Sequence, residues 1–86
     1  MGDMARVMFR PSTEALKVIS LGLTIAFYRR ARGLTQSELA EAVQISRTHM
    51  SNIEAPNSHT SLSLNKLMDI AEALEIPLKT LFDFKR

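Results

Sequence analysis

The sequence predicts a small all-α domain of five helices. Three observations lead to this fold class. Apolar residues recur with a helical period in several segments, capping residues stand where those segments begin, and no segment combines strand alternation with hairpin turns. The 86 residues make one domain, and the 45% hydrophobic content suffices for a small core. With 6% aromatic residues and no Trp, that core is expected to be aliphatic.

The first predicted helix begins near Ser12 or Thr13 and ends near Arg32, where Gly33 is a natural stop. Apolar residues lie near one stripe of this helix: Leu16, Ile19, Leu23 and Phe27. Residues 1–11 show no helical period. We therefore expect an N-terminal arm and the start of an extended first helix over residues 1–20, followed by the main helical domain over residues 21–86.

The second and third predicted helices are short and separated by a tight turn. The second covers residues 36–43 and follows a T-x-x-E capping box formed by Thr35 and Glu38. The third covers residues 46–55; Ser46 caps it, and it ends before Pro56 because proline removes a backbone donor. The inner residues of this corner are apolar: Leu39, Ala40, Val43, Ile45, Met50 and Ile53. This is the helix-turn-helix plan, although an ordinary corner between two core helices would have the same inner residues.

The fourth and fifth predicted helices complete the fold. Ser63 caps the fourth helix, whose apolar residues keep a helical period: Leu64, Leu67, Ile70, Ala71 and Leu74. Pro77 opens a short fifth helix that carries Leu78, Leu81 and Phe82. Of these, we expect Leu81 to close the core over Leu74.

The composition argues against several classes of function. The chain has no cysteine, which excludes disulfides and thiolate metal sites, and His49 and His59 lack ligand spacing. We expect no metal site, no cofactor and no enzymatic activity, since there is also no Gly-rich phosphate loop and no histidine beside a plausible nucleophile. No apolar run approaches a membrane-spanning length and the start does not read as a signal peptide, so we expect a cytoplasmic protein without a membrane partner.

The distribution of charge is more informative than the net charge of +2. Up to Thr35, two acids, Asp3 and Glu14, stand against six bases: Arg6, Arg10, Lys17, Arg29, Arg30 and Arg32. A basic front half indicates a polyanion as partner. From charge alone, a merely solvated run of charges is an equally good interpretation.

The third predicted helix has an unusual outer face. Ser, Thr, His and Asn are weak helix formers, yet "SRTHMSNIEA" spaces Met50 and Ile53 as an inner helical face. This helix is one of four motifs that occur in order along the chain: the "LG" opening, "GLTQSELA", "SRTHMSNIE" and "IAEALEIPLKTLF". Between Leu21 and Phe82 the chain therefore resembles the lambda-repressor-like, Cro/C1-type (XRE) helix-turn-helix family.

This resemblance implies a role for that outer face. In the family, the second helix of the pair lies in the major groove of DNA and its N-terminal residues reach the bases. The residues at those positions here are Ser46, Arg47, Thr48, Ser51 and Asn52. Arg can bond bidentately to guanine, Asn to adenine, and the Thr methyl can contact thymine. The first turn of the helix also has no acid, which leaves its positive dipole end unneutralised.

The resemblance implies two further roles. Gln36 matches a glutamine that holds a DNA phosphate, the alternative being an ordinary polar residue in a first turn. Arg29 and Glu54 match a salt bridge between the first and third helices, the alternative being two independent surface charges.

Two positions depart from the family pattern. Gln44 stands where the family usually has glycine, and a left-handed backbone there would cost roughly 1 kcal/mol. Pro56 stands where glycine often follows the third helix.

The resulting prediction is a sequence-specific DNA-binding transcriptional regulator that binds a two-fold symmetric operator as a homodimer. Leu78, Phe82 and Phe84 are the expected dimer interface, with the N-terminal arm that carries Arg6 and Arg10 as the rival. The main alternative is an antitoxin that binds a toxin and its own promoter. An interaction module without DNA affinity ranks last, because the outer face lacks acidic or bulky apolar residues. A small controller from a mobile element or a restriction system would look much the same.

Overall fold

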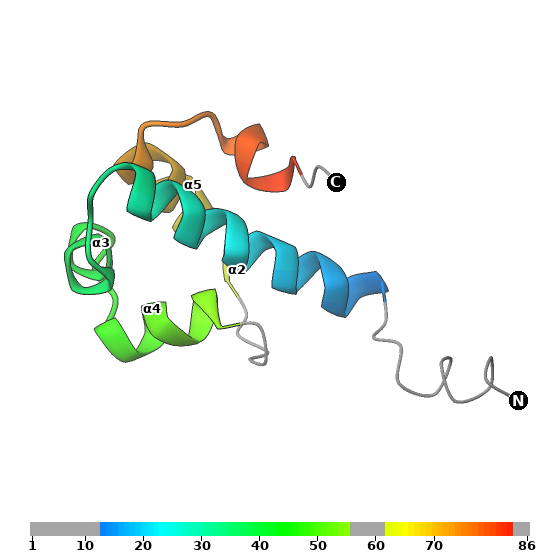
Figure 1. Cartoon of the computed structure of the whole chain (residues 1–86), viewed down its shortest axis with the longest axis horizontal. Helices are drawn as coiled ribbons and strands as arrows, with labels where there is room; N and C mark the ends of the chain where they lie inside the picture. The colour runs from blue at the N-terminus through cyan, green and yellow to red at the C-terminus, as the bar shows by residue number, and fades with distance from the viewer. Residues whose placement is uncertain (1–12, 56–61, 84–86) are drawn as a thin grey trace, which may run out of the picture.

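The computed structural model describes residues 13–55 and 62–83, with side chains from residue 21 onward. Within these ranges the chain forms four α-helices and one 3-10 helix and no strand: α2 (Thr13–Ala31), α3 (Gln36–Ala42), α4 (Arg47–Glu54), α5 (Leu64–Leu74) and η1 (Leu78–Phe82) (Figure 1). The all-α fold class is confirmed. The expected count of five helices is wrong for α-helices in the described part, because the last element is a 3-10 helix.

The short η1 segment explains that difference. Its turns close through bonds between residues three apart, from Thr80 N to the Pro77 carbonyl at 2.9 Å and from Asp83 N to the Thr80 carbonyl at 3.3 Å. Pro77 lacks a backbone donor, and only five residues follow in the element. Such short pieces commonly take the tighter 3-10 form.

The three predicted caps are present. Thr35 Oγ1 accepts from Glu38 N at 3.0 Å, and Thr35 N donates to Glu38 Oε1 at 2.8 Å, which completes the capping box of α3. Ser46 and Ser63 each accept a backbone N–H three residues onward, at 3.0 and 3.1 Å, at the starts of α4 and α5. Each cap satisfies a backbone donor that the helix itself leaves unpaired.

Three of the helices end in the same left-handed turn. Gly33, Gln44 and Glu75 have φ angles of 73°, 61° and 60° after α2, α3 and α5. After α3, Ile45 N donates to the Ala40 carbonyl at 2.9 Å and Gln44 N to the Glu41 carbonyl at 3.2 Å. This is the Schellman pattern, which usually has glycine at the left-handed residue. Gln44 therefore keeps the backbone of the family turn without its glycine.

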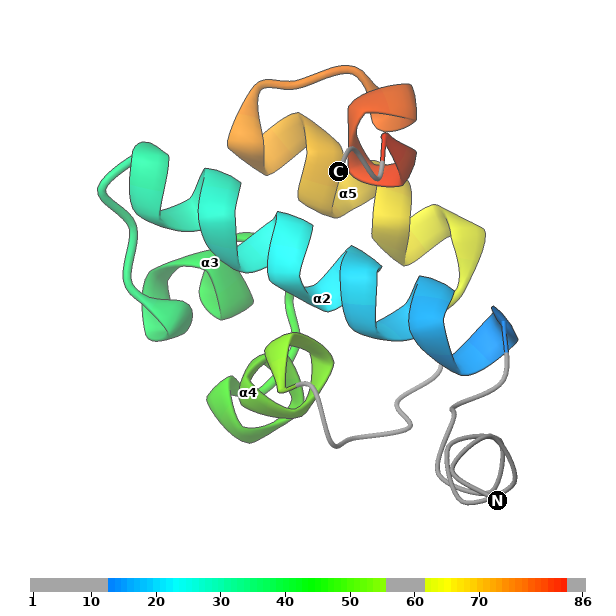
Figure 2. The ribbon, with the colours of Figure 1, turned by 45° about the vertical axis from the view of Figure 1, so that its right-hand side comes forward.

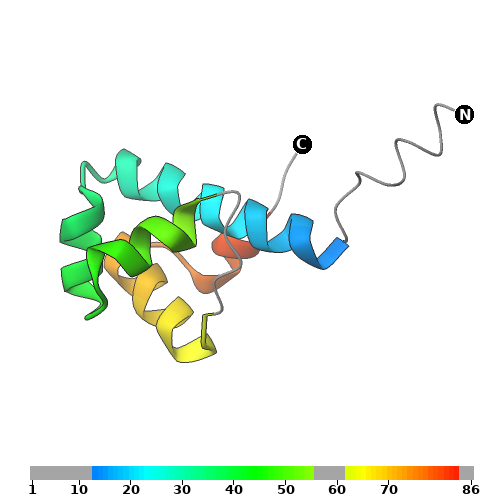
Figure 3. The ribbon, with the colours of Figure 1, turned by 90° about the horizontal axis from the view of Figure 1, so that it is seen from below.

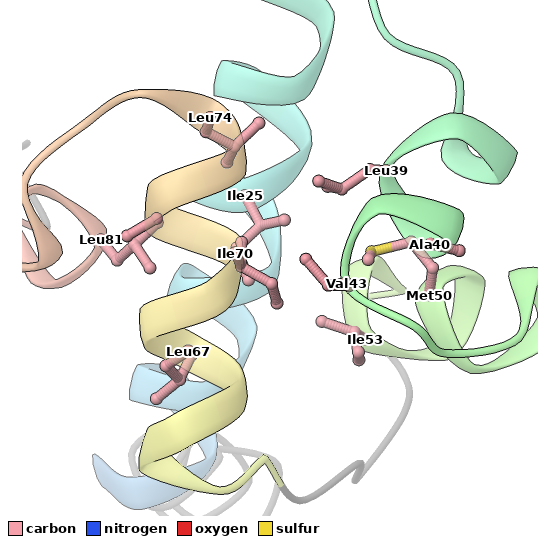
Figure 4. Close-up of a cluster of buried hydrophobic side chains, with 11 residues drawn as sticks. Ile25, Leu39, Ala40, Val43, Met50, Ile53, Leu67, Ile70, Leu74 and Leu81 are labelled. Atoms are coloured by element: carbon pink, nitrogen blue, oxygen red, sulfur yellow. The ribbon is translucent and has the colours of Figure 1, made fainter.

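Within the described residues, the core is one aliphatic cluster to which all five elements contribute (Figure 4). Leu81 is fully buried, as is Leu74, so the expectation that Leu81 closes the core is confirmed. The fully buried large side chains come from every element: Ile25, Leu39, Met50, Ile70, Leu74 and Leu81.

From residue 21 onward, the predicted apolar stripe of α2 is not its buried face. Leu23 and Phe27 are 53% and 62% exposed, whereas α2 buries Ile25, Ala26 and Arg29. Because apolar residues occur on several sides of this helix, its sequence contains two overlapping stripes. The packing of neighbouring helices buries the stripe that includes Arg29. None of the helices within the described ranges has the length and apolar character needed to span a membrane.

The arrangement places α4 at an outer edge of the molecule. α2 lies between α4 on one side and η1 on the other in both side views (Figures 1 and 2). α4 packs against α3 and α2, while η1 packs against α5 and α2. Seen from below, α4 crosses in front of α2 (Figure 3). The first half of α2 extends beyond the body formed by the other elements.

Candidate nucleic-acid interface

Helix α4 is amphipathic in the way its sequence predicts. Met50 and Ile53 are 0% and 6% exposed and point into the corner with α3 and α2. Ser46, Arg47, Thr48 and Asn52 are exposed on the outside, and Ser51 is half-buried. Burial of two apolar residues therefore anchors the helix, while its outer side chains remain available for contact.

Ser46 has a structural role in addition to the role that the resemblance implies. Its hydroxyl oxygen accepts from His49 N at 3.0 Å and caps α4. A hydroxyl group has one proton to donate besides its acceptor lone pairs. Ser46 can therefore donate to a ligand without leaving the cap.

The charges of the first and third predicted helices meet in a buried pair. Arg29 Nε donates to Glu54 Oε2 at 2.7 Å, and Arg29 Nη2 donates to Glu54 Oε1 at 3.1 Å. The two side chains are only 9% and 4% exposed. Arg29 Nη1 also donates to the Leu34 carbonyl at 2.8 Å, beyond the end of α2. The structure thus brings together the two residues of the expected pair, and the alternative of independent surface charges does not fit this geometry.

Gln36 joins this pair through a contact that sequence reasoning missed. Its Nε2 donates to Glu54 Oε1 at 3.0 Å, across 18 positions in the chain. The amide nitrogen must face Glu54, because a carboxylate only accepts hydrogen bonds. Nε2 has a second proton, which stays available for a phosphate oxygen. Glu54 therefore links the buried arginine to the side chain expected to contact the DNA backbone.

Gly22 holds α2 and α4 together at close range. A Cβ atom on Gly22 would collide with the Ile53 carbonyl oxygen of α4. Gly22 is buried and lies inside α2, where glycine normally weakens a helix. The only sequence signal was the "LG" pair of the family motif, and its physical reason is this contact between helices.

Several positive charges in the described part are already used within the fold. Arg32 donates from Nε to the Leu74 carbonyl at 2.6 Å and from Nη2 to the Glu75 carbonyl at 3.0 Å. Lys66 Nζ donates to the Val43 carbonyl at 2.7 Å at the end of α3. With Arg29 held by Glu54, these residues tie helix ends together. Their charges contribute less to a polyanion interface than the sequence count indicates.

The expected dimer residues lie at η1 and beyond it. Leu78 is half-buried against the core, and Phe82 is 46% exposed. Phe84 lies outside the described residues, as do Pro56, His59 and the arm with Arg6 and Arg10. Within the described ranges, no group of three or more His, Asp or Glu residues is placed to hold a metal ion.

Comparisons with known proteins identify a family whose helix-turn-helix corresponds to the α3–α4 pair. The helix-turn-helix family model matches residues 25–81. The HTH-type transcriptional regulator SinR of Bacillus subtilis (strain 168) is 34% identical over 65 residues, which cover 76% of this chain. The match spans only 58% of that regulator's length.

Two solved structures have a similar fold. The restriction-modification controller protein C.AhdI from Aeromonas hydrophila has a TM-score of 0.69 at 28% identity, covering 76% of this chain and 96% of that one. The biofilm regulator SinR in complex with DNA has a TM-score of 0.66 at 33% identity, covering 73% of this chain and 98% of that one. The family match and the capped, tightly turned α3–α4 pair lead to one conclusion: the chain belongs to the lambda-repressor-like, Cro/C1-type helix-turn-helix family.

Proposed function

We propose that the protein is a sequence-specific DNA-binding transcriptional regulator that places α4 in the major groove. The observation that carries this proposal is the outer face of α4, where polar side chains stand exposed above a buried apolar face. The membership of a family of DNA-binding regulators, rather than of enzymes, supports it. The DNA-bound structure of the similar regulator SinR supports it further. The similar regulators SinR and C.AhdI come from bacteria, whose DNA lies in the cytoplasm, so we assign this protein to the cytoplasm as well.

The chemistry of each outer residue defines its role in this proposal. Arg47, in the first turn of α4, donates bidentately to guanine O6 and N7, and Asn52 pairs with adenine N6 and N7. Ser46, Thr48 and Ser51 are short, so they let the helix backbone approach the base edges. Gln36 donates its second amide proton to a phosphate, which sets the register of the protein without reading sequence.

Selection of bound sites from a random DNA pool, followed by binding measurements with Arg47→Ala, tests this function. We expect the variant to lose about 1–3 kcal/mol on the selected site and to relax the preference at one base pair. Lys79→Ala removes one charge from an exposed residue of η1, and this matched control should leave that preference unchanged. Failure of the wild-type chain to enrich any sequence would overturn the proposal.

We also propose that the regulator binds as a homodimer through Leu78, Phe82 and Phe84. One recognition helix covers few base pairs, so a specific site needs two half-sites roughly 34 Å apart. Phe82→Asp should give monomers in sedimentation equilibrium, whereas Met68→Asp, an equally exposed apolar residue on α5, should leave the dimer intact. A dimer that survives Phe82→Asp but dissociates on deletion of residues 1–10 would move the interface to the arm. No observation here favours the antitoxin alternative.

A further inference from the structure

A hollow of about 270 Å³ opens beside the outer face of α4. Leu23, Ala26 and Arg30 of α2 line one wall. The rest is lined by Gln36 at the start of α3, by Ser51 and Glu54 in the second half of α4, and by Ala55 directly after it. Gln36 and Ser51 already belong to the proposed DNA-contacting set. The hollow is therefore continuous with that surface, and Arg30 is the charged residue that the surface gains from α2.

Arg30 differs from its neighbours in the last turn of α2. Arg29 is held by Glu54, and Arg32 is held by the carbonyl groups at the end of α5. Arg30 is exposed, and its guanidinium has no ion pair or hydrogen bond within the described chain. Among the described positively charged residues of α2, α3 and α4, only Arg47 likewise makes no ion pair or side-chain hydrogen bond within the described residues.

The charges and surfaces around the hollow favour one kind of occupant. Glu54 is the acid in its wall, and its two oxygens already accept from Arg29 and Gln36, which offsets its repulsion of an anion. An arginine fork and an amide donor at one opening suit the oxygens of a phosphate. Leu23 and Ala26 provide an apolar wall on which a deoxyribose ring can rest.

We propose that Arg30 binds a DNA backbone phosphate together with Gln36 and thereby sets the register of α4 on its half-site. This inference rests on the proposed function. Phosphate contacts fix position and orientation and carry no sequence information directly. Arg30 is a positioning residue, in contrast to Arg47, whose proposed contact reads a base.

The salt dependence of DNA binding tests the inference. Each phosphate neutralised by a protein charge contributes about 0.9 to the slope of log K against log salt. Arg30→Gln should reduce the slope by about that amount for each bound protomer and weaken all sites by the same factor. Arg30→Lys keeps the charge and should retain the slope. Lys79→Gln, a matched charge loss on η1 across α2 from α4, should leave the slope unchanged.

A second measurement locates the contact on the DNA. Methylphosphonate groups, which are uncharged, would replace the phosphates of the selected half-site one at a time. Wild-type binding should weaken when the phosphate that Arg30 contacts is replaced. Arg30→Gln should respond much less to that replacement, because only the hydrogen bond from Gln36 remains. This comparison within each protein stays valid even if the variant is less stable.

The outcomes separate the two proposals. A wild-type protein that binds no selected DNA would overturn the function itself. If the wild-type protein binds the selected DNA and Arg30→Gln shows the same salt slope and the same methylphosphonate profile as wild type, the role of Arg30 is overturned and the function stays intact. Altered base preference in Arg30→Gln would also overturn it, because Arg30 would then read a base.

Discussion

Replacement of Glu54 by alanine removes the acceptor shared by Arg29 and Gln36. In the wild-type chain, Glu54 accepts three hydrogen bonds of 2.7, 3.1 and 3.0 Å from these two side chains. The substitution leaves the Arg29 guanidinium buried, at 7% residue exposure, with one remaining partner among the described residues, the Leu34 carbonyl. It also leaves the amide of Gln36 without the contact that orients it.

The burial of the pair determines the size of the effect. An exposed ion pair contributes at most about 1 kcal/mol to stability, whereas removal of one member of a buried pair costs about 3–5 kcal/mol. We expect the free energy of unfolding to fall by about 3 kcal/mol, because the bond to Leu34 still satisfies part of Arg29. For a domain of this size, that loss lowers the melting temperature by about 12–24 °C.

Thermal unfolding followed by circular dichroism measures this loss. Glu41→Ala is the matched control, since Glu41 is an exposed acid on α3, and its melting temperature should stay close to the wild-type value. The double variant Arg29→Met with Glu54→Leu should be more stable than Glu54→Ala, because it leaves no uncompensated charge. A melting temperature for Glu54→Ala within about 4 °C of wild type, the equivalent of 1 kcal/mol or less, would refute the reasoning.

Two further substitutions test the backbone. Gln44→Gly should raise the free energy of unfolding by about 0.5–1 kcal/mol, because the residue has a φ of 61°, and a loss of stability in urea unfolding would contradict the left-handed turn. Gly22→Ala should destabilise the protein although alanine favours helix by about 0.5–1 kcal/mol, because overpacking against the Ile53 carbonyl costs about 1–3 kcal/mol. A more stable Gly22→Ala would show that α4 can move away from α2 without loss.

Local signals in the sequence were sufficient to predict the elements that surround the candidate site. The capping hydrogen bonds of Thr35, Ser46 and Ser63 each join residues three positions apart, so the local sequence determines them. The inner apolar residues of α3 and α4 follow from helical period alone. These features predicted the helix pair and its outward face before any long-range contact was considered.

Long-range packing decided the remaining features. The periodicity of α2 does not show which stripe faces α4 and α5, so the burial of Arg29 and the exposure of Phe27 were set by the neighbouring helices. The bond from Gln36 to Glu54 spans 18 positions and the bond from Arg32 to Leu74 spans 42 positions. That Arg30, unlike Arg29 and Arg32, makes no ion pair or hydrogen bond within the described residues is known only from the tertiary structure. Residues so far apart in the sequence meet only through the packing of their helices. Local backbone geometry does not fix the distance between them, so the sequence around each residue does not identify its partner.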